Sequence, residues 1–130
     1  MNFIIKTCIC LGTFFLAEIN GMEADNFPWT PPKNFVLQPK YIALHHPVAT
    51  ESILGQLYFD QGLTFIYAFN HDAAYWSFLR ASEVDPNMAM AYWGMALSIG
   101  SNINMSITEQ RGKIAHDLIQ KSNAKSQEWT

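Results

Sequence analysis

The chain has 130 residues, a formal net charge of −3 and a sequence pI near 5.7, and 49% of its residues are hydrophobic. This length allows one domain of ordinary size, and the apolar content excludes an intrinsically disordered chain. The eight Lys and Arg residues are scattered and form no stripe, which excludes an electrostatic surface for nucleic acid.

Residues 1–24 have the pattern of a secretory signal peptide. One positive charge, Lys6, precedes the apolar run Thr7–Ala17. This run is too short to cross a bilayer, which needs about 20 residues. Cleavage is expected after Gly21 or Ala24, and an uncleaved N-terminal anchor is the alternative. We therefore expect an exported protein, periplasmic or secreted, with no stable membrane span once the leader is removed.

Residues 25–49 differ in composition from the rest of the chain. Their prolines lack backbone donors and hold the preceding residues in extended conformations. We expect an extended arm that packs over one end of the domain. Its aromatic and apolar residues are the expected points of contact: Phe27, Trp29, Phe35, Val36 and Tyr41.

From Thr50 onward the pattern is helical, with apolar residues recurring at three- and four-residue spacing. Thr50 or Ser52 is expected to cap a first helix, and Asn70 to supply a left-handed turn before a second helix over about 72–84. A third helix is expected over about 88–99, capped by Asn87. Ser106, in a capping box with Glu109, is expected to open a fourth helix that runs to about residue 124.

The helical part repeats itself. Displacing the chain by one repeat places large residues on large and small on small: Tyr58 on Tyr92, Phe59 on Trp93, Gln61 on Met95, Gly62 on Ala96 and Phe65 on Ile99. The helices that follow match at a larger displacement: Ala74 falls on Ala115, Phe78 on Ile119 and Ala81 on Ser122. The additional residues fall in the loop after Ile99, where an insertion costs little. We infer that one helical hairpin is used twice, over 50–87 and 88–125.

The residues of the first hairpin resemble the tetratricopeptide repeat (TPR). The family pattern is aromatic-x2-Leu-Gly-x2-Tyr, then Ala-x3-Phe-x2-Ala and Pro, over about 34 residues. This chain has Tyr58-x2-Gln61-Gly62-x2-Phe65, then Ala74-x3-Phe78-x2-Ala81 and Pro86. Gln61 departs from the usual leucine, and the second repeat is looser, with Ala96, Ile119 and Ser122 at key positions.

The resemblance covers residues 53–124 and extends to a group of exported bacterial TPR proteins. It implies an all-α fold, a right-handed α-solenoid of two hairpins, with residues 126–130 starting a truncated third repeat. An uncapped C-terminal edge then implies marginal stability or self-association, because each hairpin buries only one face alone.

The resemblance also implies a protein-binding function. TPR ligands lie along the concave face made by the first helix of each hairpin, and this chain's face is apolar, which favours an apolar peptide or helix. The expected residues are Gln56, Phe59, Leu63, Ile66, Met90, Trp93 and Leu97. Two alternatives stay open: this face is covered, by the arm or by missing C-terminal sequence, or the chain is a fragment of a longer TPR protein without independent activity.

Histidines are the main indication of other chemistry. His45, His46 and His71 offer a metal-binding alternative, but their spacing matches no metal motif. The sequence contains no glycine-rich phosphate loop and no recognisable carboxylate pair, and both cysteines fall in the leader. We expect neither an enzyme nor a cofactor.

Overall fold

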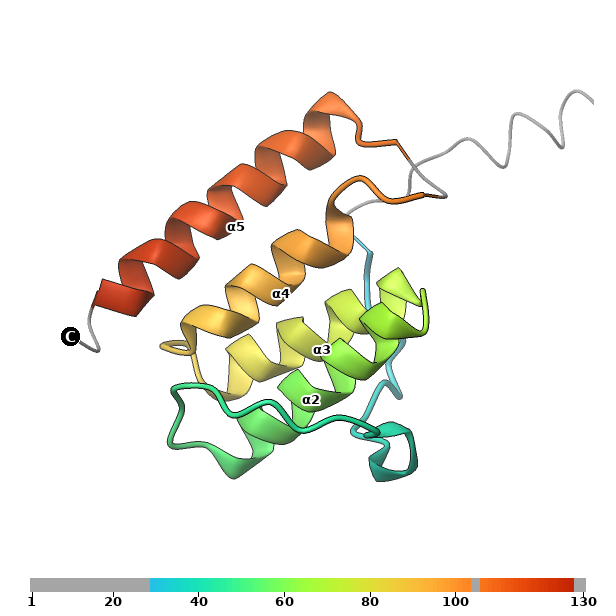
Figure 1. Ribbon diagram of the computed structural model, residues 1–130, viewed down its shortest axis with the longest axis vertical. Helices are drawn as coiled ribbons and strands as arrows, with labels where there is room; N and C mark the ends of the chain where they lie inside the picture. Colours follow the sequence, from blue (N-terminus) through green and yellow to red (C-terminus); the bar gives the residue numbers. More distant parts are fainter. Residues whose placement is uncertain (1–28, 104–105, 128–130) are drawn as a thin grey trace, which may run out of the picture.

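The computed structural model describes residues 29–103 and 106–127, and its regular elements in these ranges are all helical. They are the 3-10 turn η1 (Pro39–Tyr41), α2 (Ile53–Tyr67), α3 (His71–Val84), α4 (Ala89–Ile99) and α5 (Glu109–Gln127). Each long helix packs on the next in chain order, and α2 also contacts α4 (Figure 1). The all-α prediction is confirmed. The expected signal peptide, 1–24, lies outside the described residues.

The first two long helices begin at polar capping residues. The Ser52 hydroxyl accepts a hydrogen bond from the amide of Gly55 at 3.0 Å, and the Asn70 side chain accepts one from Ala73 at 3.3 Å. The prediction that Asn70 takes the left-handed conformation was wrong. Phe69 does so, with φ of 58°, because it follows the C-cap of α2 in a Schellman motif: its amide donates to the carbonyl of Ile66, and the amide of Asn70 donates to that of Phe65.

The last two helices start differently from the prediction. Met88, not Asn87, precedes α4, and no side chain caps this helix. The hydroxyl of Thr108, not that of Ser106, accepts the amide of Arg111 at the start of α5. This helix continues through residue 127, past the predicted end at 124, since residues 125–127 contain neither proline nor glycine to stop it.

Phe78 on α3 occupies the centre of the core, between two glycines. A Cβ added at Gly62 of α2 would lie 2.6 Å from the Phe78 ring, and one added at Gly94 of α4 would be equally close to its Cε1. Both helices approach α3 closely because these positions lack a side chain. The repeat positions Ala74, Ala81, Tyr92, Ala96 and Ile99 are buried around this centre, whereas Pro86 is exposed and Phe65, Ala115 and Ile119 are half-buried.

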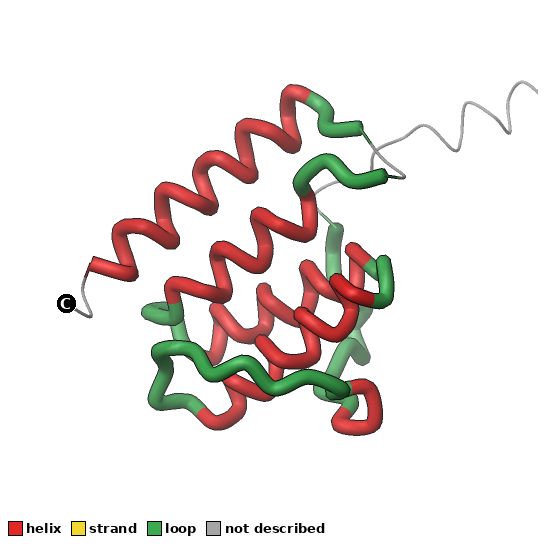
Figure 2. The backbone as a smooth tube through the Cα atoms, in the orientation of Figure 1, coloured by secondary structure: helices red, strands yellow, loops and turns green. Residues whose placement is uncertain are grey.

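The arm packs against the helices rather than extending away from them (Figure 2). Trp29 contacts the edge of Tyr75, with ring centroids 5.8 Å apart, and its carbonyl accepts the indole N–H of Trp76 at 3.2 Å. The guanidinium of the buried Arg111, on α5, lies 5.1 Å from the Trp29 ring. The arm therefore joins α3 and α5 at its first described residue. Farther along, the rings of Phe35 and Tyr41 pack on Trp76 and Phe65, whereas Val36 is exposed.

Candidate binding groove

Asp60, in the middle of α2, is the main anchor of the arm. Its side chain is 2% exposed. One carboxylate oxygen accepts the amide of His46 at 3.0 Å and the side-chain amide of Gln56 at 2.9 Å, and the other lies 2.7 Å from Nδ1 of His45. A buried carboxylate needs such partners, because burial without them costs several kcal/mol. Asp60 therefore fixes this part of the arm on α2.

Neighbouring polar residues of α2 extend this attachment. The Gln61 side chain is fully buried, accepts the amide of Gln38 at 2.6 Å and donates to the hydroxyl of Ser77 at 3.1 Å. The Thr64 hydroxyl accepts the amide of Ala43 at 3.2 Å. The Gln61 amide thus bridges the arm and α3. A leucine at this position could not form either of these hydrogen bonds.

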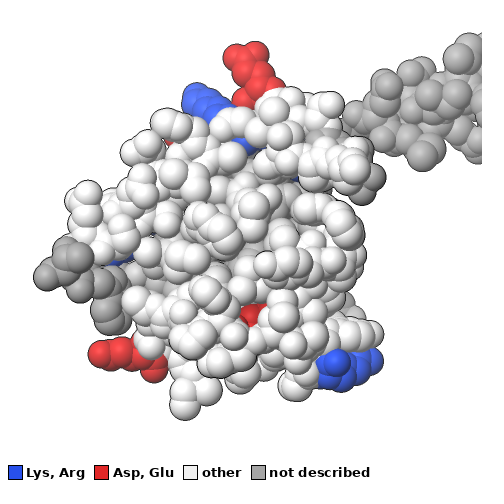
Figure 3. Space-filling view, viewed as in Figure 1, with Lys and Arg blue, Asp and Glu red and all other residues white. Residues whose placement is uncertain are grey.

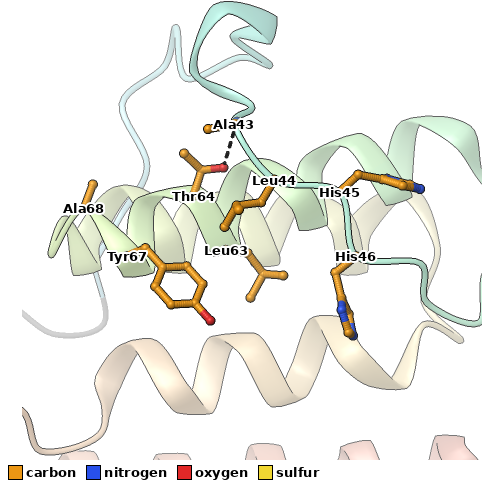
Figure 4. Close-up of a pocket in the computed structure, with 8 residues that line it drawn as sticks. All are labelled: Ala43, Leu44, His45, His46, Leu63, Thr64, Tyr67 and Ala68. Atoms are coloured by element: carbon orange, nitrogen blue, oxygen red, sulfur yellow. Dashed lines mark hydrogen bonds between the residues drawn. The ribbon is translucent and has the colours of Figure 1, made fainter.

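A hollow of about 530 Å³ lies between the arm and the C-terminal half of α2, lined by Ala43, Leu44, His45, His46, Leu63, Thr64, Tyr67 and Ala68. A second hollow of about 150 Å³ adjoins it and reaches α4, lined by His46, Phe59, Leu63, Tyr67, Met90 and Trp93. They share three residues and form one depression, which we call the arm groove. In Figure 4, Leu63, Tyr67 and His46 project toward the same side of α2, whereas His45 points away.

The face that carries the arm groove has few charges. In Figure 3 the lysine, arginine and acidic side chains lie mainly at the periphery of this view, and its centre, over the arm, α2 and α4, is almost uncharged. Leu44 and Tyr67, at the rim of the groove, are 39% and 72% exposed. The surface is therefore suited to an apolar ligand rather than a charged one.

The structure places the predicted concave-face residues at several different sites. Leu63, Met90 and Trp93 line the arm groove. Phe59 also borders it, but its side chain is fully buried in the core, and Gln56 holds the arm through Val48 and His46. Ile66 packs against the core and lines neither hollow.

Leu97 belongs to a separate depression. This hollow of about 330 Å³ lies between α4 and α5, and we call it the α4–α5 groove. Its lining residues are Trp93, Ala96, Leu97, Ala115, His116 and Ile119. Only Trp93 borders both grooves, so substitutions at the other residues can separate them.

The three histidines of the metal alternative are not brought together. His45 pairs with Asp60, and His46 lines the arm groove. The ring nitrogens of His71 are buried and have no hydrogen-bond partner among the described residues. In the part of the chain that the structure describes, no group of three or more His, Cys, Asp or Glu side chains has a metal-binding arrangement.

Sequence reasoning missed the parts of the groove that come from the arm. Ala43 and Leu44 line it only because the arm runs back along α2, and no local pattern indicates that path. Tyr67 carried a usable signal, since it lies one helical turn after Leu63 on the same helix and therefore shares its face.

No protein-family model matches the chain, and neither the curated proteins nor the solved structures compared with it include a match. In the described ranges, no helix combines the length and the apolar character needed to span a membrane.

Proposed function

We propose that this protein is an exported TPR-like helical-repeat module that binds an apolar segment of another protein in the arm groove. The observation that carries the proposal is the groove itself, an open hollow lined by Leu44, Leu63, Tyr67, Met90 and Trp93 on an almost uncharged face. The two similar helix pairs, packed in chain order as a right-handed α-solenoid would require, support the repeat assignment.

The ligand is a peptide or helix that inserts two or three large apolar side chains. The groove is bounded by helices on one side and by the arm on the other, so it fits an elongated segment better than a flat surface. Its polar side chains are largely engaged: Thr64 binds Ala43, and His45 pairs with Asp60. We assign the chain no catalytic role.

A displayed library of random peptides, selected on the purified protein, tests the binding. Selected peptides should share apolar residues, and Tyr67→Lys and Leu44→Lys should each weaken their binding about tenfold or more by placing a charge in the groove. Both side chains are substantially exposed, so these variants should fold. Val84→Lys, at the far end of α3 and 39% exposed, is the matched control. Peptides that bind all four proteins equally would contradict the proposal.

Export is tested separately with an alkaline phosphatase fusion in a bacterial host. This reporter becomes active only after it leaves the cytoplasm, where its disulfides form. A fusion carrying residues 1–24 should be active, and a fusion lacking them should be inactive. Equal activity of the two would refute the assignment of a signal peptide.

A further inference from the structure

The contact between α4 and α3 shows how a helix packs against the hairpin that precedes it, formed by α2 and α3. Gly94 lies directly against the ring of Phe78, and the Sδ of Met95 accepts the hydroxyl of Ser82 at 3.9 Å. Ala91 and Ser98 lie on the same side of α4, about one turn before and one turn after Gly94, and both are fully buried. The face of α4 that packs against α3 therefore carries small residues, at Ala91, Gly94 and Ser98.

Because of the internal repeat, the second hairpin has a surface that corresponds to the surface of the first hairpin on which α4 packs. The α4–α5 groove is lined by Trp93, Ala96, Leu97, Ala115, His116 and Ile119. The displacements that take Tyr58 to Tyr92 on the first helix and Ala81 to Ser122 on the second relate these residues to Phe59, Gly62, Leu63, Ala74, Tyr75 and Phe78 of the first hairpin. Of these counterparts, Phe78 lies directly against Gly94 of α4, and Phe59 and Leu63 line a hollow together with Met90 and Trp93 of α4. The groove is thus the counterpart of a surface on which this fold already packs a helix.

A second copy of the chain cannot fill the groove with the counterpart of α4. In register, Gly94, Met95 and Ser98 correspond to Asp60, Gln61 and Thr64 of α2. The arm binds all three of these side chains through the amides of His46, Gln38 and Ala43. The face of α2 that would enter the groove of another copy is therefore occupied by the arm.

We propose that the α4–α5 groove binds an α-helix of another protein, one that carries small residues at the spacing of Ala91, Gly94 and Ser98. Small residues allow the helix backbone to approach Ile119, as Gly94 allows α4 to approach Phe78. The inference rests on the helical repeat of the proposed function, but it uses a groove that excludes Leu44 and Tyr67.

The probe is a fluorescein-labelled peptide with the sequence of residues 87–101, which contains α4. It carries Met90→Lys, Trp93→Lys and Leu97→Lys for solubility, since these three lie on a different face of the helix from Ala91, Gly94 and Ser98. Fluorescence polarisation should show saturable binding to the full chain. A second peptide that also carries Gly94→Leu should bind about tenfold or more weakly, because the added side chain meets the groove floor.

Protein variants separate this site from the arm groove. Leu97→Lys and Ile119→Lys should each weaken binding of the probe about tenfold or more, whereas Tyr67→Lys should leave it within about twofold. Leu97 is 42% exposed, so its variant should fold even if the Ile119 variant does not. Absence of saturable binding, or equal binding by the Leu97 variant, would overturn the inference. A dimer of the protein alone that Leu97→Lys dissociates would overturn it too, because the occupant would then be a second copy.

Discussion

Phe78 shows how one large residue and two small ones set the distance between three helices. Its ring contacts Gly62 on α2 and Gly94 on α4, so neither position tolerates a Cβ without movement of the ring or of a helix. The close approach at Gly62 could be expected from sequence, because the TPR pattern that the first hairpin resembles has a glycine at this position. The close approach at Gly94 could not, because the displacement that places Tyr58 on Tyr92 aligns Gly94 with Asp60.

Gly94→Ala should therefore destabilise the protein by about 1–3 kcal/mol, since overpacking a filled core outweighs the gain in helix propensity. Gly112→Ala is the matched control. It also lies in a helix, but its added Cβ would come no closer than 3.7 Å to the Ile107 side chain. That substitution should stabilise the protein by roughly 0.5–1 kcal/mol.

Urea denaturation of the two single variants measures this difference. Adding Phe78→Leu to Gly94→Ala should cost less than the sum of the separate effects, because a smaller residue leaves space for the new methyl group. Additive losses, or a stabilised Gly94→Ala, would show that the ring does not limit the approach of α4.

At the scale of elements, local signals and long-range contacts specify different helix ends. The start of α2 could be predicted because Ser52 is a cap that acts within one turn. The start of α4 could not, since it depends on residues far apart in the chain. The side chain of Asn87, the predicted cap, instead accepts a hydrogen bond from the ammonium group of Lys125 on α5, 38 residues farther along the chain.

The arm is the element that depends most on one side chain. Asp60→Ala leaves the His46 amide without its acceptor and removes one of the two acceptors of the Gln56 side-chain amide, a loss of about 1–3 kcal/mol. Because the arm's contacts with α2 centre on this carboxylate, we expect local release of the arm before the helices unfold.

Limited proteolysis with trypsin measures this release at Lys33 and Lys40, which lie in the arm. Cleavage there should be about five- to tenfold faster in Asp60→Ala than in the unmodified protein, as the open form becomes more populated. Asp117→Ala removes an exposed carboxylate from α5 and should not change the rate. Equal acceleration by both substitutions would indicate a general loss of stability instead.

At the scale of the whole molecule, the helical framework was accessible from sequence and the groove only in part. Apolar spacing and the internal repeat identify α2 to α5 because these signals are local. The arm groove needs the arm to return along α2 through buried polar contacts of Asp60 and Gln61. Such pairing depends on the assembled fold, and a polar residue on a helix does not identify its partner.

The ionisation of Tyr75 makes the unfolding free energy of the protein depend on pH in the alkaline range. Burial raises the pKa of its phenol above 10.0. Above pH 10.0 the folded state therefore keeps a proton that the unfolded state releases. The contribution of Tyr75 to the unfolding free energy is constant below pH 10.0 and decreases as the pH rises beyond it. The loss from this group cannot exceed about 1.4 kcal/mol per pH unit.

Urea unfolding at about pH 9, 10 and 11 measures this slope. Tyr75→Phe should reduce the fall in unfolding free energy above pH 10.0, whereas Tyr67→Phe, at an exposed position, should leave it unchanged. The same slope in all three proteins would assign the alkaline loss to other groups.

Trp29 contacts Tyr75 and Trp76 of α3 and also lies beside Arg111 of α5. A row of helices that touch only their neighbours can fray from its last member, since that member has a single interface to lose. Here, α5, the last helix of the described ranges, must also give up a tryptophan that comes from the opposite end of these ranges. Amide hydrogen exchange in α5 should therefore follow the exchange of α3, and the row should open as one unit.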